Sequence, residues 1–490
     1  MHGFRWTAAG LALRISLVAS FASLASFAVP QLATAQVATL AERDQLDERM
    51  AEYAGEPGAV VAIVREGKVV LAEGYGVANL EHGIPLGRET VLDIGSVAKQ
   101  FTAFAVALLA DDGALSLDDN IRIHLPEVPD FGQVITVRHM IHHMSGLREI
   151  YNSESLAGRQ NGDAMQQADA LRLTEHMHEL NFTPGEQYLY CNTAYMMLAD
   201  IVSRTSGMPF PEFMAERVFG PVGMHHTTIM SKLGQSIPGV AESYASDEVG
   251  FVRVYDNSSL YGAGGMYSTV DDLVAWMDNY GSASVGGAAV IEQMQEQGVL
   301  NSGEALSYAF GINVGELRGQ RVIRHTGSSA GFRASFTFLP ELEGGVITLS
   351  NRSNIGSGMP ADVLEIFFGD HLQPLSADLP ADDEDSDEDE ESESWSPTAT
   401  QLTSLSGSYY SEELETVYTL YVEDGMLMGR HRRHGTFELE AMAPMTFEGP
   451  GFFGTVVFES SSSGVGGGIP QTFRVSNGRV LNLLFQRIEL

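Results

Sequence analysis

The sequence predicts an α+β fold in which helices sandwich an antiparallel sheet, with a further helical region and a small all-β barrel at the C-terminal end. Segments rich in β-branched residues lie at both ends of residues 36–373, and helix-like segments broken by Gly and Pro fill the middle. Strands at both ends with helices between them favour one sheet closed by the two ends of the segment. Residues 399–490 alternate apolar and polar residues around turn dipeptides, as a small barrel does.

Residues 1–35 are predicted to be a secretory signal. Arg5 and Arg14 are the only charged residues before the apolar run ISLVASFASLASFAV, and the tripeptide ATA at 33–35 offers a small-residue cleavage site. The protein is therefore expected to be exported, periplasmic or secreted, with no stable membrane span after signal cleavage. A retained membrane anchor is the alternative, which the shortness of the apolar run disfavours.

Composition limits the partners that the chain is expected to bind. A formal net charge of −36 argues against a nucleic-acid partner and against anionic membrane surfaces, because both need clustered Lys and Arg. The single cysteine, Cys191, allows no internal disulfide. Nothing in the sequence indicates a cofactor or an oligomeric state.

The body of the chain, residues 36–373, is predicted to begin and end with strands. Val, Ile and Leu alternate or run together in the strand segments, and Gly-containing turns separate them. In order, we expect a helix over 40–54, two strands within 58–76, a helix over 96–110, helices within 136–223, a helix from about 267 with Ser268 and Asp271 at capping-box spacing, and strands within 308–316, 321–327, 332–340 and 344–351.

An acidic linker over residues 374–398 is predicted to separate the body from the tail. Its sequence, PLSADLPADDEDSDEDEESESWSPT, has no hydrophobic period, so charge repulsion should keep it extended and disordered. Calcium binding is disfavoured because such runs are usually solvated. In the tail, Asp424-Gly425 and Asn477-Gly478 predict type I′ hairpin turns.

Ser96 and Lys99 are the first candidate catalytic pair. They are three residues apart at the start of a predicted helix, which places hydroxyl and amine on one face. A serine needs a base to become a nucleophile, and a partly buried lysine can lose its proton, whereas a guanidinium does not. Only three of the 28 basic residues are lysines, so a position that merely needed charge would normally carry arginine. A solvated helical lysine remains the alternative.

Two further motifs carry polar groups suited to acyl transfer. Tyr190 and Asn192 alternate just before an apolar helix, so a phenol that moves protons and a carboxamide that binds a substrate amide could face one cleft. Farther along, RHTGSSAGF places glycines after a β-branched strand. Backbone N–H groups near Ser328, together with that of Ser96, could form an oxyanion hole.

In this order and at these separations, the three motifs resemble the active site of the penicillin-binding-protein and class C β-lactamase superfamily of serine hydrolases. The resemblance runs from about residue 40 to 370 and includes PGAVVAIVREGKVVLAEGYG, MIHHMSGL, FTPGEQYLYCN and YGAGGMYSTVDDLVAW. It implies an acyl-enzyme on Ser96, with Lys99 and Tyr190 sharing its proton and Tyr190 protonating the leaving group. Asn192 would bind the substrate amide.

The resemblance also assigns the third motif and the tail. His325, Thr326, Gly327 and Ser328 would line the strand opposite the nucleophile. The tail is similar to the lipocalin-like barrels fused to D-aminopeptidase-type members of the superfamily, where that domain can border the active site.

One departure from the family bears on the substrate. Many β-lactamases have lysine where this chain has His325, and a neutral histidine captures a β-lactam carboxylate less well. Arg333 could supply the missing charge, or could simply lie on the outer strand face. The same H-T-G motif occurs in D-stereospecific peptidases and in some esterase-like relatives, so the resemblance implies a D-stereospecific peptidase, aminopeptidase or esterase acting on a small peptide or ester. A class C-type β-lactamase acting on a lactam, and a non-hydrolytic peptide- or peptidoglycan-binding protein, stay open.

Two other groups of residues were weighed and given structural interpretations. His139, His142 and His143 lack the carboxylate motif of a zinc hydrolase, so no metal site is expected. Cys191 lacks a dedicated base and is interpreted as a packed thiol.

Overall fold

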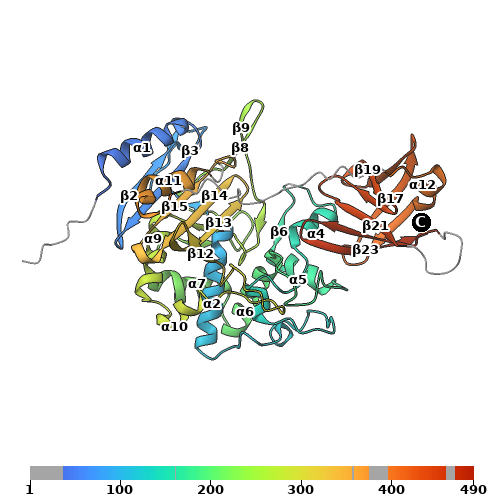
Figure 1. The fold of residues 1–490 in the computed structure, drawn as a ribbon, viewed down its shortest axis with the longest axis horizontal. Coiled ribbons are helices and arrows are strands. Elements are labelled where there is room, and N and C mark those ends of the chain that lie inside the picture. Colours follow the sequence, from blue (N-terminus) through green and yellow to red (C-terminus); the bar gives the residue numbers. More distant parts are fainter. Residues whose placement is uncertain (1–36, 161, 356–357, 375–394, 460–468, 490) are drawn as a thin grey trace, which may run out of the picture. The chain divides into compact units, whose positions relative to one another are not determined.

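The computed structural model describes residues 37–489, apart from 161, 356–357, 375–394 and 460–468 (Figure 1). The predicted signal segment and most of the predicted acidic linker lie outside these residues. The described residues from Val37 onward belong to one compact unit. Among the helices within that range, none combines the length and the apolar character needed to cross a membrane.

A six-stranded antiparallel sheet built from both ends of the body confirms the predicted fold class. Strands β1 and β2 come from the N-terminal side, and the other four come from the C-terminal side, where β15 pairs with β1. In sheet order the strands are β12 (Asn313–Leu317), β13 (Gln320–Ser329), β14 (Phe332–Leu339), β15 (Gly344–Ser350), β1 (Ala59–Arg65) and β2 (Lys68–Tyr75).

Helices cover both faces of this sheet, as the continuous apolar run of β1 requires. Its alternate residues enter different hydrophobic clusters: Val61 packs with α1 (Leu40–Met50) and α11 (Gly358–Phe368), whereas Ala62 packs in the cluster that contains α2 (Lys99–Asp111) and α9 (Val270–Ser282). Because successive side chains of a strand point to opposite faces, a strand buried on both sides is apolar throughout.

The predicted helical region is present between α2 and the last strands (Figure 1). The cap of α9 differs from the prediction by one residue, because Thr269, not Ser268, accepts the hydrogen bond from Asp272 N–H. The remaining helices are α3 (Val137–Ile141), α4 (Ile150–Leu156), α5 (Gln167–Glu175), α6 (Asn192–Ser206), α7 (Phe210–Met214), α8 (Gly220–Val222) and α10 (Gly287–Gln293).

Short strands connect these elements. The pair that matters most for the site joins β5 (Leu92–Asp93), just before Ser96, to β11 (Met266–Ser268), which in turn pairs with β7 (Thr228–Ile229). The others are β3 (Val77–Asn79), β4 (Ile84–Pro85), β6 (Met165–Gln166), β8 (Tyr244–Asp247), β9 (Gly250–Arg253) and β10 (Ser258–Ser259).

The tail forms a closed eight-stranded barrel, which confirms that prediction. The strands that follow α12 (Ala399–Leu405) are β16 (Gly407–Ser411), β17 (Thr416–Glu423), β18 (Met426–His431), β19 (Gly435–Ala443), β20 (Thr446–Glu448), β21 (Thr455–Glu459), β22 (Thr472–Asn477) and β23 (Val480–Ile488). Aromatic rings fill the interior, where Phe473 stacks on Phe485.

One predicted barrel turn lies where expected and the other is displaced by one residue. Asp424 and Gly425 both have positive φ, as a type I′ turn requires. In the β22–β23 hairpin, Asn477 still pairs with Val480, so Gly478 and Arg479 are the two turn residues. The displacement places an arginine at the tip of this hairpin.

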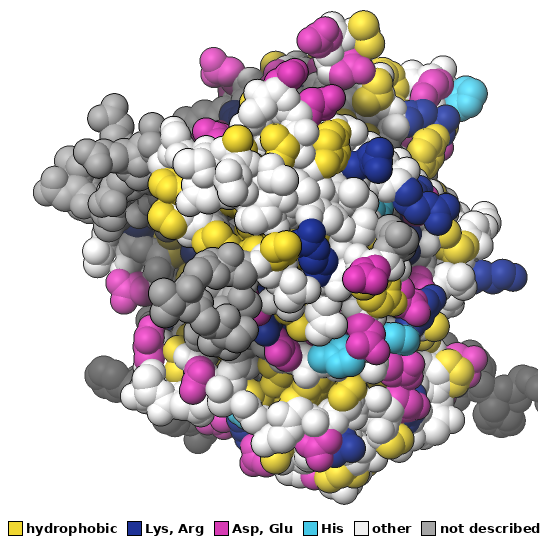
Figure 2. All heavy atoms as spheres, turned by 90° about the vertical axis from the view of Figure 1, so that its right-hand side faces the viewer, with side chains coloured by type: hydrophobic (Ala, Val, Ile, Leu, Met, Phe, Trp, Pro, Cys, Tyr) yellow, Lys and Arg dark blue, Asp and Glu magenta, His cyan; other side chains and the backbone are white. Residues whose placement is uncertain are grey.

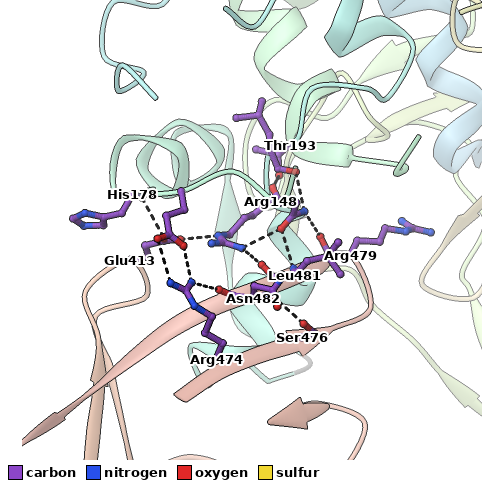
Figure 3. Close-up of polar contacts among 12 residues, drawn as sticks. Arg148, His178, Thr193, Glu413, Arg474, Ser476, Arg479, Leu481 and Asn482 are labelled. Carbon is purple, nitrogen blue, oxygen red and sulfur yellow. Dashed lines mark hydrogen bonds and ion pairs between the residues drawn. The ribbon is translucent and has the colours of Figure 1, made fainter. Parts of the chain in front are cut away.

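Polar contacts join the barrel to the helical region (Figure 3). Arg148 Nε donates to Glu413 Oε2 at 2.8 Å, and the two side chains are only 1% and 6% exposed. Asn181 donates to the carbonyl of Arg479 and accepts from Leu481 N–H. Arg148 also donates to the Leu481 carbonyl, so Arg148 and Asn181 together hold the β22–β23 hairpin against the body.

Acidic and basic side chains are interspersed on the face shown in Figure 2, with hydrophobic side chains scattered among them. Such a surface contains no broad positive field for a polyanion on that face.

Candidate active site

Ser96 lies in a tight turn that the sheet holds in place. A 3₁₀ turn over Gly95–Ala98 begins directly after β5 and continues into α2. Asp93 accepts hydrogen bonds from Gly95 N–H at 2.8 Å and from the Ser329 hydroxyl at 2.7 Å, which ties this turn to the end of β13. Gly95 has a φ of +49°, a conformation that side chains disfavour. The nucleophile candidate is thus fixed by backbone geometry and is half-buried.

Lys99 is fully buried beside Ser96. Its Nζ lies 3.0 Å from Ser96 Oγ, 2.7 Å from Asn192 Oδ1 and 2.8 Å from the carbonyl oxygen of Ala263. Burial lowers the pKa of the Lys99 ammonium well below its usual range, and the negative charge of Glu149 opposes this. A larger fraction of neutral amine is therefore available near pH 7 than for an ordinary lysine.

Three oxygens surround Lys99 Nζ, so the site accommodates both the ammonium, which has three donors, and the neutral amine that would act as a base. Such an amine has two N–H donors and one lone pair. The oxygens of Asn192 and Ala263 only accept, so they take the two N–H bonds. The lone pair is then left for Ser96 Oγ, which is the orientation that lets Lys99 remove the serine proton.

Tyr190 borders the same group. Lys99 Nζ lies 4.7 Å from the centre of its ring. Burial raises the pKa of the Tyr190 phenol above its ordinary value, while interaction with the Ser96 hydroxyl and the positive charge of Arg479 act the other way. Tyr190 is therefore a neutral proton donor near pH 7, which suits it to protonate a leaving group more than to deprotonate Ser96.

Asn192 is oriented by charges on both sides of its carboxamide. Its Oδ1 faces Lys99, and its Nδ2 donates to Glu149 Oε1 at 2.8 Å. Lys99 Nζ donates to Oδ1, and the Glu149 carboxylate only accepts, so the amide has one allowed orientation. One Nδ2 hydrogen stays available for a substrate carbonyl.

Glu149 is buried and does two things at once. Its other oxygen, Oε2, caps α4 by accepting from Tyr151 N–H and Asn152 N–H. Because the carboxylate both orients Asn192 and raises the pKa of Lys99, it is a positioning residue for the candidate base.

Glu149→Gln is expected to lower kcat/KM by about 10–100-fold, the range of one lost charge-assisted hydrogen bond. The acidic limb of the pH–rate profile should also move to lower pH. Loss of a nearby negative charge lowers the pKa of Lys99 further, so the neutral amine persists at lower pH. Steady-state kinetics on an ester across pH would measure both effects.

Glu154→Gln on the same helix is the matched control, since Glu154 pairs with Arg159 instead of Asn192. Glu154→Gln should leave the pH–rate profile unchanged. If the acidic limb of the Glu149→Gln profile stays fixed or moves to higher pH, the positioning role of Glu149 is contradicted.

Strand β13 brings the third motif against the nucleophile turn. An added Cβ at Gly327 would lie 2.0 Å from the carbonyl oxygen of Ile94, and one at Gly95 would lie 2.6 Å from Ser328 N. Both glycines are needed for this close approach. It brings the backbone of Ser328 against the turn that carries Ser96, and the sequence predicts an oxyanion hole from the N–H groups of these two residues; Thr326 is exposed.

His325 and Arg333 do not offer the charge that a substrate carboxylate needs. His325 Nδ1 lies 2.6 Å from Thr326 O, and Nε2 lies 3.1 Å from the Tyr308 hydroxyl, so protein groups engage both nitrogens. Burial and the nearby Lys99 lower the pKa of His325 to about 4, which makes it neutral at pH 7. Arg333 donates to the carbonyls of Ala330 and Phe332 in its own hairpin.

The histidine cluster and the cysteine have packing roles. His139 takes part in the cap of α3, whereas His143 accepts from Cys191 N–H and packs 4.1 Å from the Tyr190 ring. No group of metal-ligating side chains converges within the described residues. Burial raises the pKa of Cys191 to about 12, so its thiol is unreactive.

Sequence reasoning missed three contributors to the site: Glu149, the Ala263 carbonyl and Arg479. Glu149 lies directly after MSGLR and Ala263 within YGAGG, both segments already noted, but nothing local marks them as neighbours of Lys99. Arg479 lies 4.8 Å from the centre of the Tyr190 ring and comes from the barrel. Its position beside a predicted hairpin turn was the only signal.

Comparison of the sequence with known proteins identifies a matching family model and similar proteins. Residues 43–367 match the family model described as Beta-lactamase. The D-aminopeptidase of Brucella anthropi is 30% identical over 278 residues, which cover 56% of this chain and 52% of that protein. The D-aminopeptidase of Gluconobacter oxydans (strain 621H) is 26% identical over 320 residues, covering 65% of this chain and 60% of that protein. The chain thus spans little more than half the length of these relatives.

Solved structures share the fold. The octameric penicillin-binding protein homologue from Pyrococcus abyssi aligns with a TM-score of 0.61 at 22% identity, covering 91% of this chain and 99% of that chain. The D-amino acid amidase from Ochrobactrum anthropi SV3 aligns with a TM-score of 0.57 at 21% identity, covering 68% and 98%. At these identities the likeness concerns the fold alone.

Proposed function

This chain belongs to the beta-lactamase family, and from that premise we propose that it is a serine hydrolase that cleaves an amide or ester bond through an acyl-enzyme on Ser96. The observation that carries the proposal is the environment of Lys99. A fully buried lysine with a lowered pKa lies 3.0 Å from a serine hydroxyl, and its two other neighbours are oxygens that can only accept from it. A structural lysine does not need this arrangement, whereas a general base does.

Acylation follows from these contacts. Lys99 Nζ takes the proton of Ser96 while Oγ attacks the substrate carbonyl, and the oxyanion forms near the N–H groups of Ser96 and Ser328. Tyr190 donates its phenolic proton to the leaving group and regains one from the Lys99 ammonium. Water then attacks the ester on Ser96, and its proton returns through the same groups to restore the serine hydroxyl.

We propose a D-amino-acid peptide or amide as the preferred substrate class. The similar proteins named D-aminopeptidase support this preference, as does the neutral His325, which lacks the charge to capture a lactam carboxylate. Hydrolysis of a β-lactam is the second candidate, and the family match favours it.

Parallel turnover of a D-alanyl anilide, an L-alanyl anilide, a p-nitrophenyl ester and a chromogenic cephalosporin would test the proposal. We expect the D-anilide to be cleaved faster than the L-anilide and the cephalosporin slowly, all through Ser96. Efficient turnover of the cephalosporin with both anilides inert would make the β-lactamase activity the better conclusion. Tight peptide binding without turnover of any substrate would point to a binding protein.

A further inference from the structure

The β22–β23 hairpin of the barrel carries a cation to the active site. Arg479 occupies its turn, and the backbone on both sides is anchored: the Arg479 carbonyl accepts from Asn181 Nδ2 at 3.0 Å, and Leu481 N–H donates to Asn181 Oδ1 at 2.9 Å. The Leu481 carbonyl in turn accepts from Arg148, which pairs with Glu413. This network fixes the hairpin, and Figure 3 shows the Arg479 side chain directed away from the Arg148–Glu413 pair.

The Arg479 guanidinium reaches the proton-transfer groups. Its central carbon lies 4.8 Å from the centre of the Tyr190 ring, and Lys99 Nζ lies 4.7 Å from the same centre. Burial sets the direction of the pKa shifts of Lys99 and Tyr190, and the charge of Arg479 lowers both. Arg479 is therefore close enough to act on whatever binds beside Tyr190.

No acidic partner accounts for this charge. Within the described part of the chain, the Arg479 guanidinium forms no ion pair, although the protein has a net charge of −36. Arg474 of the same hairpin, by contrast, pairs with Glu179 and Glu459. A partly buried guanidinium without an acidic partner can bind an anionic ligand, and its planar fork matches a carboxylate in particular.

The third motif supplies no other cation that could bind a substrate carboxylate. His325 is neutral and engaged by Tyr308 and Thr326, and Arg333 is engaged within its own hairpin. Arg479 is thus the guanidinium that lies against Tyr190 and remains free for substrate.

We propose that Arg479 binds the free carboxylate of the leaving group, so that the preferred substrate is a peptide whose scissile bond is followed by a C-terminal amino acid. This rests on the proposed acyl-enzyme reaction, in which the leaving nitrogen lies at the Tyr190 hydroxyl. In an α-amino acid the carboxylate carbon is two bonds from that nitrogen, about 2.5 Å. The Arg479 guanidinium, 4.8 Å from the centre of the Tyr190 ring, is close enough to bind a carboxylate held beside Tyr190.

The test compares D-alanyl-D-alanine with its C-terminal amide, because the two share the same internal peptide bond and differ only in the carboxylate. We expect the wild type to favour the free acid in kcat/KM. Arg479→Met should lower kcat/KM for the acid by about 10–100-fold more than for the amide, the range of a charge-assisted contact. The kcat/KM of Arg479→Lys for the acid should lie between those of the wild type and Arg479→Met, because lysine keeps the charge and loses the planar guanidinium.

Arg474→Met is the matched control, since it removes a cation and a barrel–body ion pair without touching Tyr190. Arg474→Met should keep the preference for the free acid over the amide. Equal cleavage of both peptides by the wild type, or an equal loss for both in Arg479→Met, would overturn the proposal.

Calorimetric binding to Ser96→Ala separates this inference from the proposed reaction. If the wild type cleaved neither peptide and no acyl-enzyme formed, the proposed function would fail. Binding of the acid that disappears with Arg479→Met would still support the carboxylate site. Binding of the acid that persists in Arg479→Met would overturn the proposed carboxylate site.

Discussion

Ser96→Ala is expected to lower kcat by about 10³–10⁶-fold on every substrate that the enzyme turns over, the range observed when a catalytic nucleophile is removed. The Ser96 hydroxyl lies 3.0 Å from Lys99 Nζ, and the other candidate nucleophile, Cys191, cannot replace it. The thiol of Cys191 is buried and its raised pKa keeps it protonated. The variant should fold normally, since alanine fills less space at a half-buried position.

Covalent labelling gives this prediction a second measurement. A serine-directed phosphonate should add one adduct to the wild-type mass and none to Ser96→Ala, and the exposed Ser302→Ala should label like the wild type. Equal labelling of Ser96→Ala would place the nucleophile elsewhere. Residual turnover above the expected range would do the same, because it would require a second base–nucleophile pair.

The fold was predictable from patterns that act over short distances. The apolar run of β1 indicates a strand covered by helices on both faces, and the alternation in the tail indicates a barrel with one buried face. The strand expected within 308–316 begins only at Asn313, and two other errors concern register. The α9 cap moved from Ser268 to Thr269, and the second barrel turn moved to Gly478 and Arg479, because both depend on pairing with distant strands.

The candidate site divides in the same way. Ser96, Lys99, Tyr190 and Asn192 were visible because each motif is local and the spacing itself carries chemical information. Glu149 was not, since its role depends on Asn192 lying across from the α4 cap, 43 residues away in sequence. Arg479 was hidden further, because contacts with Asn181 and Arg148, which are distant in sequence, hold its hairpin against the body beside Tyr190.

Lys99→Arg is expected to reduce the rate of Ser96 acylation by about 10²–10⁴-fold, the contribution of a positioned general base. The substitution keeps the positive charge that Asn192 Oδ1 and the Ala263 carbonyl can accept from. It removes the lone pair, because a guanidinium stays protonated at any pH that the protein survives. Charge without proton exchange should therefore bind substrate but fail to activate Ser96.

The other two lysines provide the matched controls. Lys68 and Lys232 are exposed, so Lys68→Arg and Lys232→Arg should acylate at the wild-type rate in stopped-flow measurements with a p-nitrophenyl ester. Thermal unfolding would check that the bulkier Lys99→Arg still folds, and Lys99→Met, which fits the cavity without a charge, should be equally slow. A fast Lys99→Arg enzyme would mean that charge alone suffices beside Ser96. Slow variants at all three lysines would trace the loss to the protein as a whole, whereas loss at Lys99 alone assigns proton transfer to its amine.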